Sequence, residues 1–362
     1  MINSRTVTLE EICEKGSSNI AQNEIENNFG TYPIYGAAGF IKNVDFYKSD
    51  KPYIGIVKDG AGVGRVSIHP EKSSLIGTMQ YIFPNENVDI NYLAEFLKSQ
   101  NLGRFYTGAT IPHIYFKDYK SIKLNLPSLE NQRYIAKEFC KCNEIIKKHK
   151  ALLEKYDILI KSRFIEMFGD PVQNPMEWKI FNLGSFIENA NNGMARRGND
   201  KNGKIVLRLV ELQRGFLDYS ECNRIEIKSN EEKYLLKNND FLFARVNGNP
   251  DNVGRCCYYK DIGENVYHND HIIRVHFDEN RLNEYFLNTL LNSDYGKSEF
   301  KKYIKTSAGQ YTIAQDGISS AQIPVPPLEL QKQFAAFVQQ IDKSKFEIAN
   351  SLKRLYNKGM LS

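Results

Sequence analysis

The chain has 362 residues, of which 41% are hydrophobic, and it carries 48 Lys and Arg against 43 Asp and Glu, a formal net charge of +5. This hydrophobic content excludes an intrinsically disordered chain, and the length suits two domains of about 100–150 residues plus connecting segments. The small positive excess is compatible with a polyanionic partner but does not require one. No run of about 18 apolar residues occurs, so we expect no membrane span.

The six Cys residues show no C-x₂-C spacing of a zinc site and are too few for a disulfide scaffold. The first 16 residues are polar and lack the apolar core of a signal peptide. A reducing compartment is the natural environment of such a chain. We therefore expect a cytoplasmic protein without membrane contact.

The first expected elements belong to one domain. A strand leading into a short helix is predicted at residues 7–12, and a buried strand at residues 54–58. A polar, Gly-rich loop then leads to a second strand that bears Val63-Gly64-Arg65. Residues 92–99 have the pattern of an amphipathic helix, and residues 104–110 form the turn that follows.

A long helix is predicted next. Pro127-Ser128-Leu129-Glu130-Asn131-Gln132 is typical of a helix start, because proline precedes helices and a first-turn glutamate matches the helix dipole. Positions in alternating steps of four and three from Ile135 to Met167 are apolar except at His149 and Arg163, which is a heptad pattern. Gly169-Asp170-Pro171 is expected to end this helix.

The elements then occur a second time. After an opening at residues 178–187 come a buried strand at residues 241–245 and a strand bearing Val253-Gly254-Arg255. An amphipathic helix is predicted at residues 284–293, with a turn at residues 302–306. The motif Pro-x-Leu-Glu-x-Gln begins again at Pro326, which is 326 − 127 = 199 residues after the first copy.

The second heptad series matches the first in register. Each of its seven positions lies 199 residues after a position of the first helix, so two unrelated surface helices are a poor explanation. A narrow apolar seam requires another helix, and the other copy in the same chain is the nearest partner. The expected seam consists of Ile135, Phe139, Ile146, Leu153, Tyr156, Phe334, Val338, Ile341, Ile348, Leu352 and Leu355. Because the helices are alike and the domains differ, we expect the domains to recognise different things.

This arrangement resembles the specificity subunit of a Type I restriction–modification system over essentially the whole chain. The resemblance depends on the Pro-x-Leu-Glu-x-Gln helix starts, used twice after divergent domains, and on residues 108–114 and 310–313 before the last strand of each domain. It implies an α+β fold in which two target recognition domains of mixed β-sheet and short helices are separated by two long antiparallel helices forming a coiled coil. The expected parts are residues 1–128 and 171–326 as recognition domains, and residues 129–170 and 327–362 as spacer helices.

The resemblance also implies the partners. Each recognition domain would read one half of a bipartite site on double-stranded DNA, and two modification (methyltransferase) subunits would dock on the chain. S-adenosylmethionine would be bound by those subunits, and ATP and Mg²⁺ by restriction subunits where these are present. This chain would bind no cofactor itself. A rigid helical spacer agrees with this role, because paired readers of DNA half-sites need a set separation.

DNA contacts are expected to combine phosphate-holding side chains with base-reading Arg, Asn and Gln. In the second domain a basic loop surrounds Arg196 and Arg197, and a second candidate segment, residues 245–249, has turn chemistry as its alternative explanation. In the first domain the Gly-rich loop lacks the Gly-Lys-Ser/Thr of a nucleotide-binding loop, so it is either a DNA-facing loop or a plain turn. The candidate DNA-binding residues are Lys58, Arg65, Gln80, Arg104, Tyr106, Thr107, Thr110, Arg196, Arg197, Arg245, Asn247, Asn249, Arg255, Asn269, Lys305, Thr306 and Gln310.

We predict no metal site and no catalytic residue. His268 and His271 are three apart in an expected strand and would face opposite sides, which disfavours a shared metal ion. An Asn/Asp-Pro-Pro-Tyr/Phe methyltransferase motif and a helicase P-loop are both missing from the sequence. The alternatives are a non-enzymatic scaffold that binds protein or RNA through two domains on a helical stalk, and a self-contained enzyme with an unrecognised site.

Overall fold

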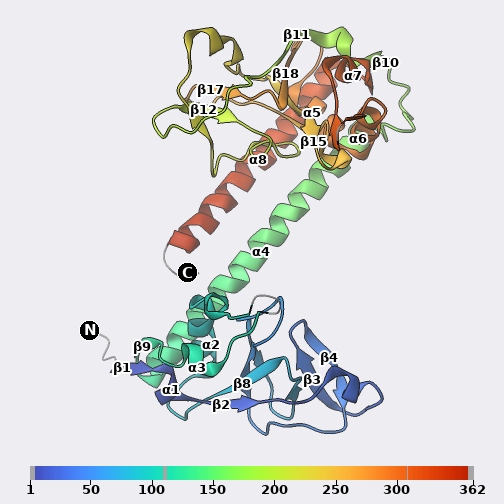
Figure 1. Cartoon of the computed structure of the whole chain (residues 1–362). Helices are drawn as coiled ribbons and strands as arrows, with labels where there is room; N and C mark the ends of the chain where they lie inside the picture. The colour runs from blue at the N-terminus through green and yellow to red at the C-terminus, as the bar shows by residue number, and fades with distance from the viewer. Residues whose placement is uncertain (1–4, 109–111, 308, 358–362) are drawn as a thin grey trace. The chain divides into compact units, whose positions relative to one another are not determined.

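The structure is a computed structural model that describes residues 5–108, 112–307 and 309–357 (Figure 1). It divides into two compact units, one of residues 1–150 and 349–362 and one of residues 151–348. Each contains a globular domain of mixed helix and sheet, which confirms the α+β class. The two expected long helices are present as α4 (Leu129–Phe168) and α8 (Leu328–Asn357).

The first domain contains two main sheets, and a pair of strands closes it next to α4. The pair is β1 (Arg5–Thr8) with β9 (Lys123–Leu126), antiparallel. The sheets have the strand orders β2-β8-β5-β6 and β4-β3-β7. Their strands are β2 (Cys13–Ser17), β3 (Tyr32–Gly36), β4 (Gly39–Val44), β5 (Tyr53–Val57), β6 (Val66–His69), β7 (Ser74–Leu75) and β8 (Met79–Pro84).

The helices of the first domain are short except for one. They are α1 (Leu9–Ile12), α2 (Ile90–Ser99), α3 (Phe116–Tyr119) and the 3-10 helices η1 (Gln22–Ile25) and η2 (Leu102–Phe105). Helix α2 starts where the Asp89 carboxylate accepts hydrogen bonds from the amides of Asn91 and Tyr92, both at 3.0 Å. Its face bearing Leu93 and Leu97 is buried in the core with the strands of the four-stranded sheet.

The second domain repeats this plan with more strands. β10 (Ile180–Asn182) pairs with β21 (Gln322–Pro324), again directly before a long helix. Three sheets have the orders β11-β18-β14-β16, β13-β12-β17 and β15-β20-β19. Their strands are β11 (Ile187–Asn192), β12 (Lys204–Leu207), β13 (Arg224–Ile225), β14 (Phe241–Ala244), β15 (Val246–Asn247), β16 (Cys256–Tyr258), β17 (Val266–His268), β18 (Ile272–Phe277), β19 (Lys305–Ser307) and β20 (Gln310–Thr312). The helices are α5 (Glu284–Asn292), α6 (Asp294–Lys301), α7 (Gln315–Ser320), η3 (Leu183–Phe186), η4 (Ser229–Tyr234) and η5 (Pro250–Asn252).

The same backbone hydrogen bonds occur in both domains. The amide of Gly64 donates to the carbonyl of Val57, and the amide of Gly254 to the carbonyl of Ala244, each at 2.8 Å. Both glycines have positive φ, +84° and +77°, which residues with a Cβ rarely adopt. A Cβ at Gly64 would also lie 2.2 Å from the backbone nitrogen of Gly103. The Val-Gly-Arg repeat therefore marks the same closing hydrogen bond in both domains, although the loop it closes has six residues in the first domain and nine in the second.

The two long helices pack antiparallel within the second unit. Asp157 Oδ1 of α4 lies 2.5 Å from Lys345 Nζ of α8, whereas the rings of Phe164 and Phe334 are 5.5 Å apart. A later residue of α4 therefore contacts an earlier residue of α8. This direction agrees with the expected antiparallel pair.

Aromatic side chains at the end of α4 pack into the core of the second domain. Phe164 and Phe168 lie against Phe286 of α5, with ring centroids 5.6 and 4.9 Å away, and against Phe334 of α8, both at 5.5 Å. All four are at most 3% exposed. Burial of four phenyl rings makes this cluster a large contribution to the stability of the second unit.

The expected seam positions lie on the protected sides of the helices. The buried members are Ile146, Phe334, Val338 and Ile341, and the half-buried members are Ile135, Phe139, Leu153, Tyr156, Ile348, Leu352 and Leu355. Among the described residues, none of the helices is long and apolar enough to cross a membrane.

Candidate nucleic-acid interface

A small sheet gathers four of the predicted residues in the second domain. In the sheet β15-β20-β19, Asn247 and Thr306 both pair with Tyr311, Lys305 pairs with Thr312, and Gln310 pairs with Ser307. The side chains of Lys305, Thr306 and Gln310 are exposed. Because side chains alternate along a strand, Lys305 and Gln310 lie on one face of this sheet, and Thr306 and Asn247 lie on the other.

Two arginines meet next to this sheet. The backbone amide of Arg245 donates to the carbonyl of His271 at 2.8 Å, and Arg245 Nη1 donates to the carbonyl of Asp270 at 3.0 Å. Arg197 Nη2 forms an ion pair with Asp270 Oδ1 at 2.6 Å. The side chain of Arg197 is still 53% exposed, so it remains accessible to a phosphate or a base edge.

Two other predicted arginines are held by the fold. Arg196 forms a two-bonded ion pair with Glu231, at 2.8 and 2.7 Å, and also donates to the carbonyl of Glu226. The Arg196 guanidinium lowers the pKa of the Glu231 carboxyl to about 2. Arg255 is half-buried and donates to the carbonyl of Leu209, and burial lowers its pKa. Both side chains have structural partners in this state of the protein.

The predicted asparagines are used largely for local turns. Asn247 Oδ1 accepts from the amide of Asn249 at 2.9 Å, and Asn249 Oδ1 caps η5 by accepting from the amide of Asp251 at 3.0 Å. Asn249 is nevertheless exposed. Asn269 is buried and accepts from the amide of His271 at 3.2 Å, so its side chain does not reach a surface where a base could lie.

In the first domain the Gly-rich loop is joined to the segment before the last strand. The amide of Gly60 donates to the carbonyl of Pro112, and that of Ile114 to the carbonyl of Lys58, both at 2.9 Å. The exposed side chains of Tyr106 and Thr107 belong to the same segment. The structure therefore brings Lys58, Tyr106 and Thr107 into one surface, although they are far apart in sequence.

Arg65 extends this surface to a hairpin that the sequence reasoning missed. Arg65 Nη1 donates to the carbonyl of Ala37, at the tip of the β3–β4 hairpin, at 2.9 Å. Phe40 on this hairpin is 60% exposed. Arg104 is also exposed and its guanidinium lies 4.7 Å from the ring centre of Phe105. The Gly-x-x-Gly turn at residues 36–39 signalled a hairpin, but nothing local indicated that Phe40 would be exposed.

Two further predicted residues of the first domain stand apart. Gln80 lies on β8 with 6% of its surface exposed, so the structure puts this expected adenine reader inside the domain. β8 lies between β2 and β5, and its residues 79–82 are all buried, so both faces of this strand are covered. Thr110 lies outside the described residues.

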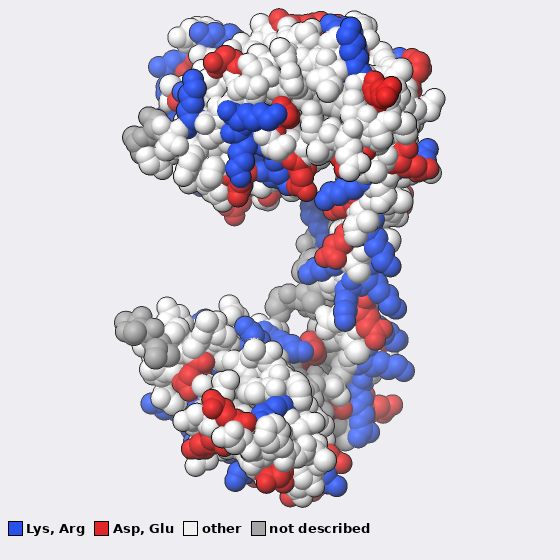
Figure 2. Space-filling model, turned by 90° about the vertical axis from the view of Figure 1, so that its right-hand side faces the viewer, with Lys and Arg blue, Asp and Glu red and all other residues white. Residues whose placement is uncertain are grey.

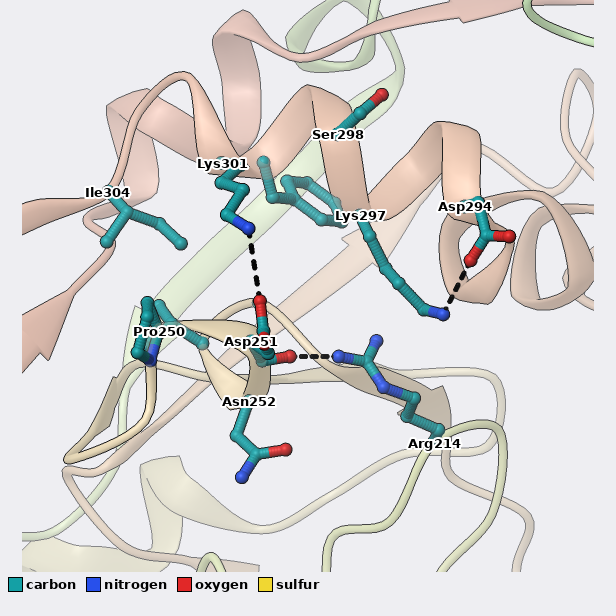
Figure 3. Close-up of a pocket in the computed structure, with 12 residues that line it drawn as sticks. Arg214, Pro250, Asp251, Asn252, Asp294, Lys297, Ser298, Lys301 and Ile304 are labelled. Carbon is teal, nitrogen blue, oxygen red and sulfur yellow. Dashed lines mark hydrogen bonds and ion pairs between the residues drawn. The ribbon is translucent and has the colours of Figure 1, made fainter.

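A basic hollow lies close to the η5 loop of the second domain. Figure 3 shows Arg214, Lys297 and Lys301 directed into a space of about 480 Å³ between η5 and α6. Lys301 Nζ is 3.1 Å from Asp251 Oδ1, Lys297 Nζ is 2.8 Å from Asp294 Oδ1, and Arg214 donates to the carbonyl of Asp251. Each cation thus already has a partner, and we assign no ligand to this hollow.

Basic side chains also gather on the first long helix. Figure 2 shows Lys and Arg along α4, and the sequence has nine basic against six acidic residues between 129 and 168.

His268, weighed above as a metal ligand, is buried and its Nδ1 lies 3.1 Å from the carbonyl of Tyr234. Within the described residues no group of three His, Cys, Asp or Glu side chains is arranged to hold a metal ion.

The fold defines a class: a duplicated protein of two α+β domains with exposed polar side chains, each followed by a long helix. The family model of the Type I restriction modification DNA specificity domain matches residues 1–155 and 175–355. The chain belongs to this family.

Two curated relatives are similar in sequence. The specificity subunit of the Type I restriction enzyme StySPI from Salmonella potsdam is 30% identical over 293 residues, which are 75% of this chain and 63% of the relative. The specificity subunit of EcoKI from Escherichia coli strain K12 is 24% identical over 297 residues, 76% of this chain and 64% of that relative. The matched region therefore spans a little under two thirds of these relatives.

Solved structures share the fold. The S subunit of a Type I restriction–modification system from M. genitalium has a TM-score of 0.63 at 15% identity, covering 99% of this chain and 95% of that one. A chain from a structure concerned with complex assembly and conformational transition of the type I R-M system has a TM-score of 0.55, also at 15% identity and with the same coverage.

Proposed function

We propose that this chain is a DNA specificity subunit, in which each of the two domains reads one half of a bipartite target. The observation that carries this proposal is the duplication itself. Gly64 and Gly254 make the same backbone hydrogen bond with a positive φ, whereas the exposed side chains beside them differ between the domains. A shared framework with different polar surfaces suits two readers of different base sequences.

The helices support the reading of one duplex at a set spacing. An α-helix of 40 residues is about 60 Å long. One turn of B-DNA is about 34–36 Å, and paired readers contact half-sites about one turn or more apart. A helical spacer of this length therefore suits a bipartite target better than two independent sites.

Two modification (methyltransferase) subunits are the proposed protein partners. Within the second unit, α4 exposes Leu152 and Leu159, one heptad apart, and Ile158 and Ile165, also one heptad apart. These side chains are 38–62% exposed. Apolar residues in heptad spacing on the outer side of a helix are typical of a protein-binding surface.

The chemistry is assigned to the partners. We propose that this chain is non-catalytic by itself, that the modification subunits bind S-adenosylmethionine, and that restriction subunits, where present, use ATP and Mg²⁺. This assignment agrees with the missing Asn/Asp-Pro-Pro-Tyr/Phe motif in the sequence.

Methylation assays test the proposal. The purified chain is combined with a modification (methyltransferase) subunit of a Type I system, and methylation is mapped over genomic DNA from a strain that lacks this gene. We expect one bipartite motif to be methylated, and only when both proteins are present. Methylation by the chain alone would support the self-contained enzyme. A complex without any preference for a duplex sequence would support the protein- or RNA-binding scaffold.

A further inference from the structure

Gln132 of α4 is buried and has a backbone partner for each of its polar atoms. Its Nε2 donates to the carbonyl of Asn87 at 3.1 Å and to that of Pro127 at 2.9 Å. Its Oε1 accepts from the amide of Asp89 at 2.8 Å. Asp89 is the residue whose carboxylate caps α2. One side chain in the first turn of α4 thus holds the start of the central helix of the first domain.

Gln331 makes the same contacts in the second domain. Its Nε2 donates to the carbonyl of Arg281 at 3.3 Å and to that of Pro326 at 2.8 Å, and its Oε1 accepts from the amide of Asn283 at 2.8 Å. Asn283 in turn caps α5 with its side chain. Gln331 is fully buried, and Gln132 is 1% exposed.

These two sets of contacts, which we call the glutamine joints, lie where each long helix leaves its own domain. The sequence of the contacted loops differs, with Asn-Val-Asp at residues 87–89 and Arg-Leu-Asn at residues 281–283. The bonds nevertheless agree one for one, because all of the contacted atoms belong to the backbone. A joint that depends on backbone atoms can remain while the recognising side chains of the domain change.

Contacts in the first turn of a long helix set the direction of the whole helix. A tilt of about 5° at the start of a helix about 60 Å long displaces its far end by about 5 Å. One base pair of B-DNA rises about 3.4 Å. A loosened joint would therefore change the separation of two DNA readers by more than one base pair, without altering either reading surface.

We propose that Gln132 and Gln331 are positioning residues that hold each long helix at a set angle to its own recognition domain, and thereby make the complex selective for the length of the gap between half-sites. This inference rests on the proposed function. It assigns to the repeated Pro-x-Leu-Glu-x-Gln motif a role in spacing, separate from the side chains that read bases.

The test uses the complex with the modification subunit and DNA in which the two half-sites are separated by the native gap or by one base pair more or fewer. Gln132→Met removes the hydrogen bonds with little change of side-chain volume. We expect the preference for the native gap to fall by about threefold or more, since three backbone groups lose a buried partner, while the preferred half-site sequences stay the same. Gln333→Met, at an exposed glutamine on α8, is the matched control and should keep the native preference.

Other outcomes separate the explanations. Equal loss of methylation at all three gap lengths would overturn the inference, because it would show a merely structural role, and so would an unchanged gap preference in a folded variant. If Gln132→Met does not fold, Gln331→Met and the shorter Gln132→Asn apply the same test. If the wild-type complex itself shows no need for two half-sites, the proposed function fails before the joints are tested.

Discussion

Three arginines of the second domain, Arg196, Arg197 and Arg255, differ in how exposed they are. All three have acceptors within the fold, but Arg196 and Arg255 are half-buried, whereas the side chain of Arg197, paired with Asp270, is still 53% exposed. Sequence proximity did not distinguish Arg196 from Arg197. The difference arises because Glu231, 35 residues away, accepts both hydrogen bonds of the Arg196 pair.

Substitution of Arg197 should affect DNA binding, whereas substitution of Arg196 should affect the stability of the fold. Arg197→Ala should weaken DNA binding by about three- to thirtyfold, with little change in melting temperature, because it removes one exposed contact to phosphate or base. Arg196→Ala should instead lower the melting temperature, because the low pKa carboxylate of Glu231 loses its partner. Fluorescence anisotropy titrations and thermal melts measure both effects. The reverse pattern would show that Arg196 is the DNA contact.

A buried histidine should make the stability of the first domain depend on pH. His69 is 4% exposed, its Nε2 lies 2.7 Å from Ser67 Oγ, and its ring contacts Tyr35 and Tyr53. Burial lowers the pKa of His69 to about 4. The ordinary value in an unfolded chain is about 6.5, so between these values the unfolded chain takes up a proton that the folded chain does not. Stability attributable to this group is therefore lost as the pH falls from about 6.5 to about 4.

His69→Phe keeps an aromatic ring in this position and cannot be protonated. As the pH falls over this range, the free energy of unfolding should decrease by about 2 kcal/mol less in the variant than in the wild type. Urea titrations at pH 7, 5.5 and 4.5 measure the difference. Equal pH slopes for the two proteins would exclude His69 as the titrating group.

At the scale of elements, α4 combines two functions. Its first turn carries the Gln132 joint, and its last turns carry Phe164 and Phe168 in the core of the second unit. Its start at Leu129 and its end before Gly169 followed from Pro127 and from the Gly-Asp-Pro sequence. The heptad spacing predicted the protected face, and the contacts of Asp157 with Lys345 determined the direction of packing in the second unit.

Lengthening α4 should lengthen the recognised gap. Insertion of seven residues after Lys155 adds about 10 Å of helix, close to three base pairs, and a four-residue insertion adds about 6 Å. A heptad keeps the apolar seam on the same face, so folding should be preserved best in that variant. We expect a longer gap in the methylated motif with both half-sites unchanged. An unchanged gap in a folded, active variant would contradict the spacer role of this helix.

At the scale of the whole molecule, two readers on one chain should act together only on one duplex. DNA with both half-sites at the native gap should be methylated, whereas two separate duplexes with one half-site each should not substitute for it. The slope of log affinity against log salt should also be steeper for the intact duplex, because more phosphates are contacted. Methylation assays and filter binding at several salt concentrations measure this. Equal slopes for the intact duplex and for a single half-site would show that only one domain binds.

The sequence by itself determined the order of elements, the two helix starts and the repeat. These depend on local causes: proline and glycine restrict the backbone, and apolar residues at heptad spacing share one face. The glutamine of each helix start was visible in the motif, but its role was not, because its partners at residues 87–89 and 281–283 lie more than 40 residues away.

Only the tertiary structure decided which polar side chains face solvent. Gln80 and Asn269 have base-reading chemistry and are buried, whereas Phe40 is apolar and exposed. Arg197 and Arg245 meet at Asp270 because strands distant in sequence end side by side. Exposure and proximity of this kind depend on how the sheets pair, and pairing is a non-local property that residue type alone does not specify.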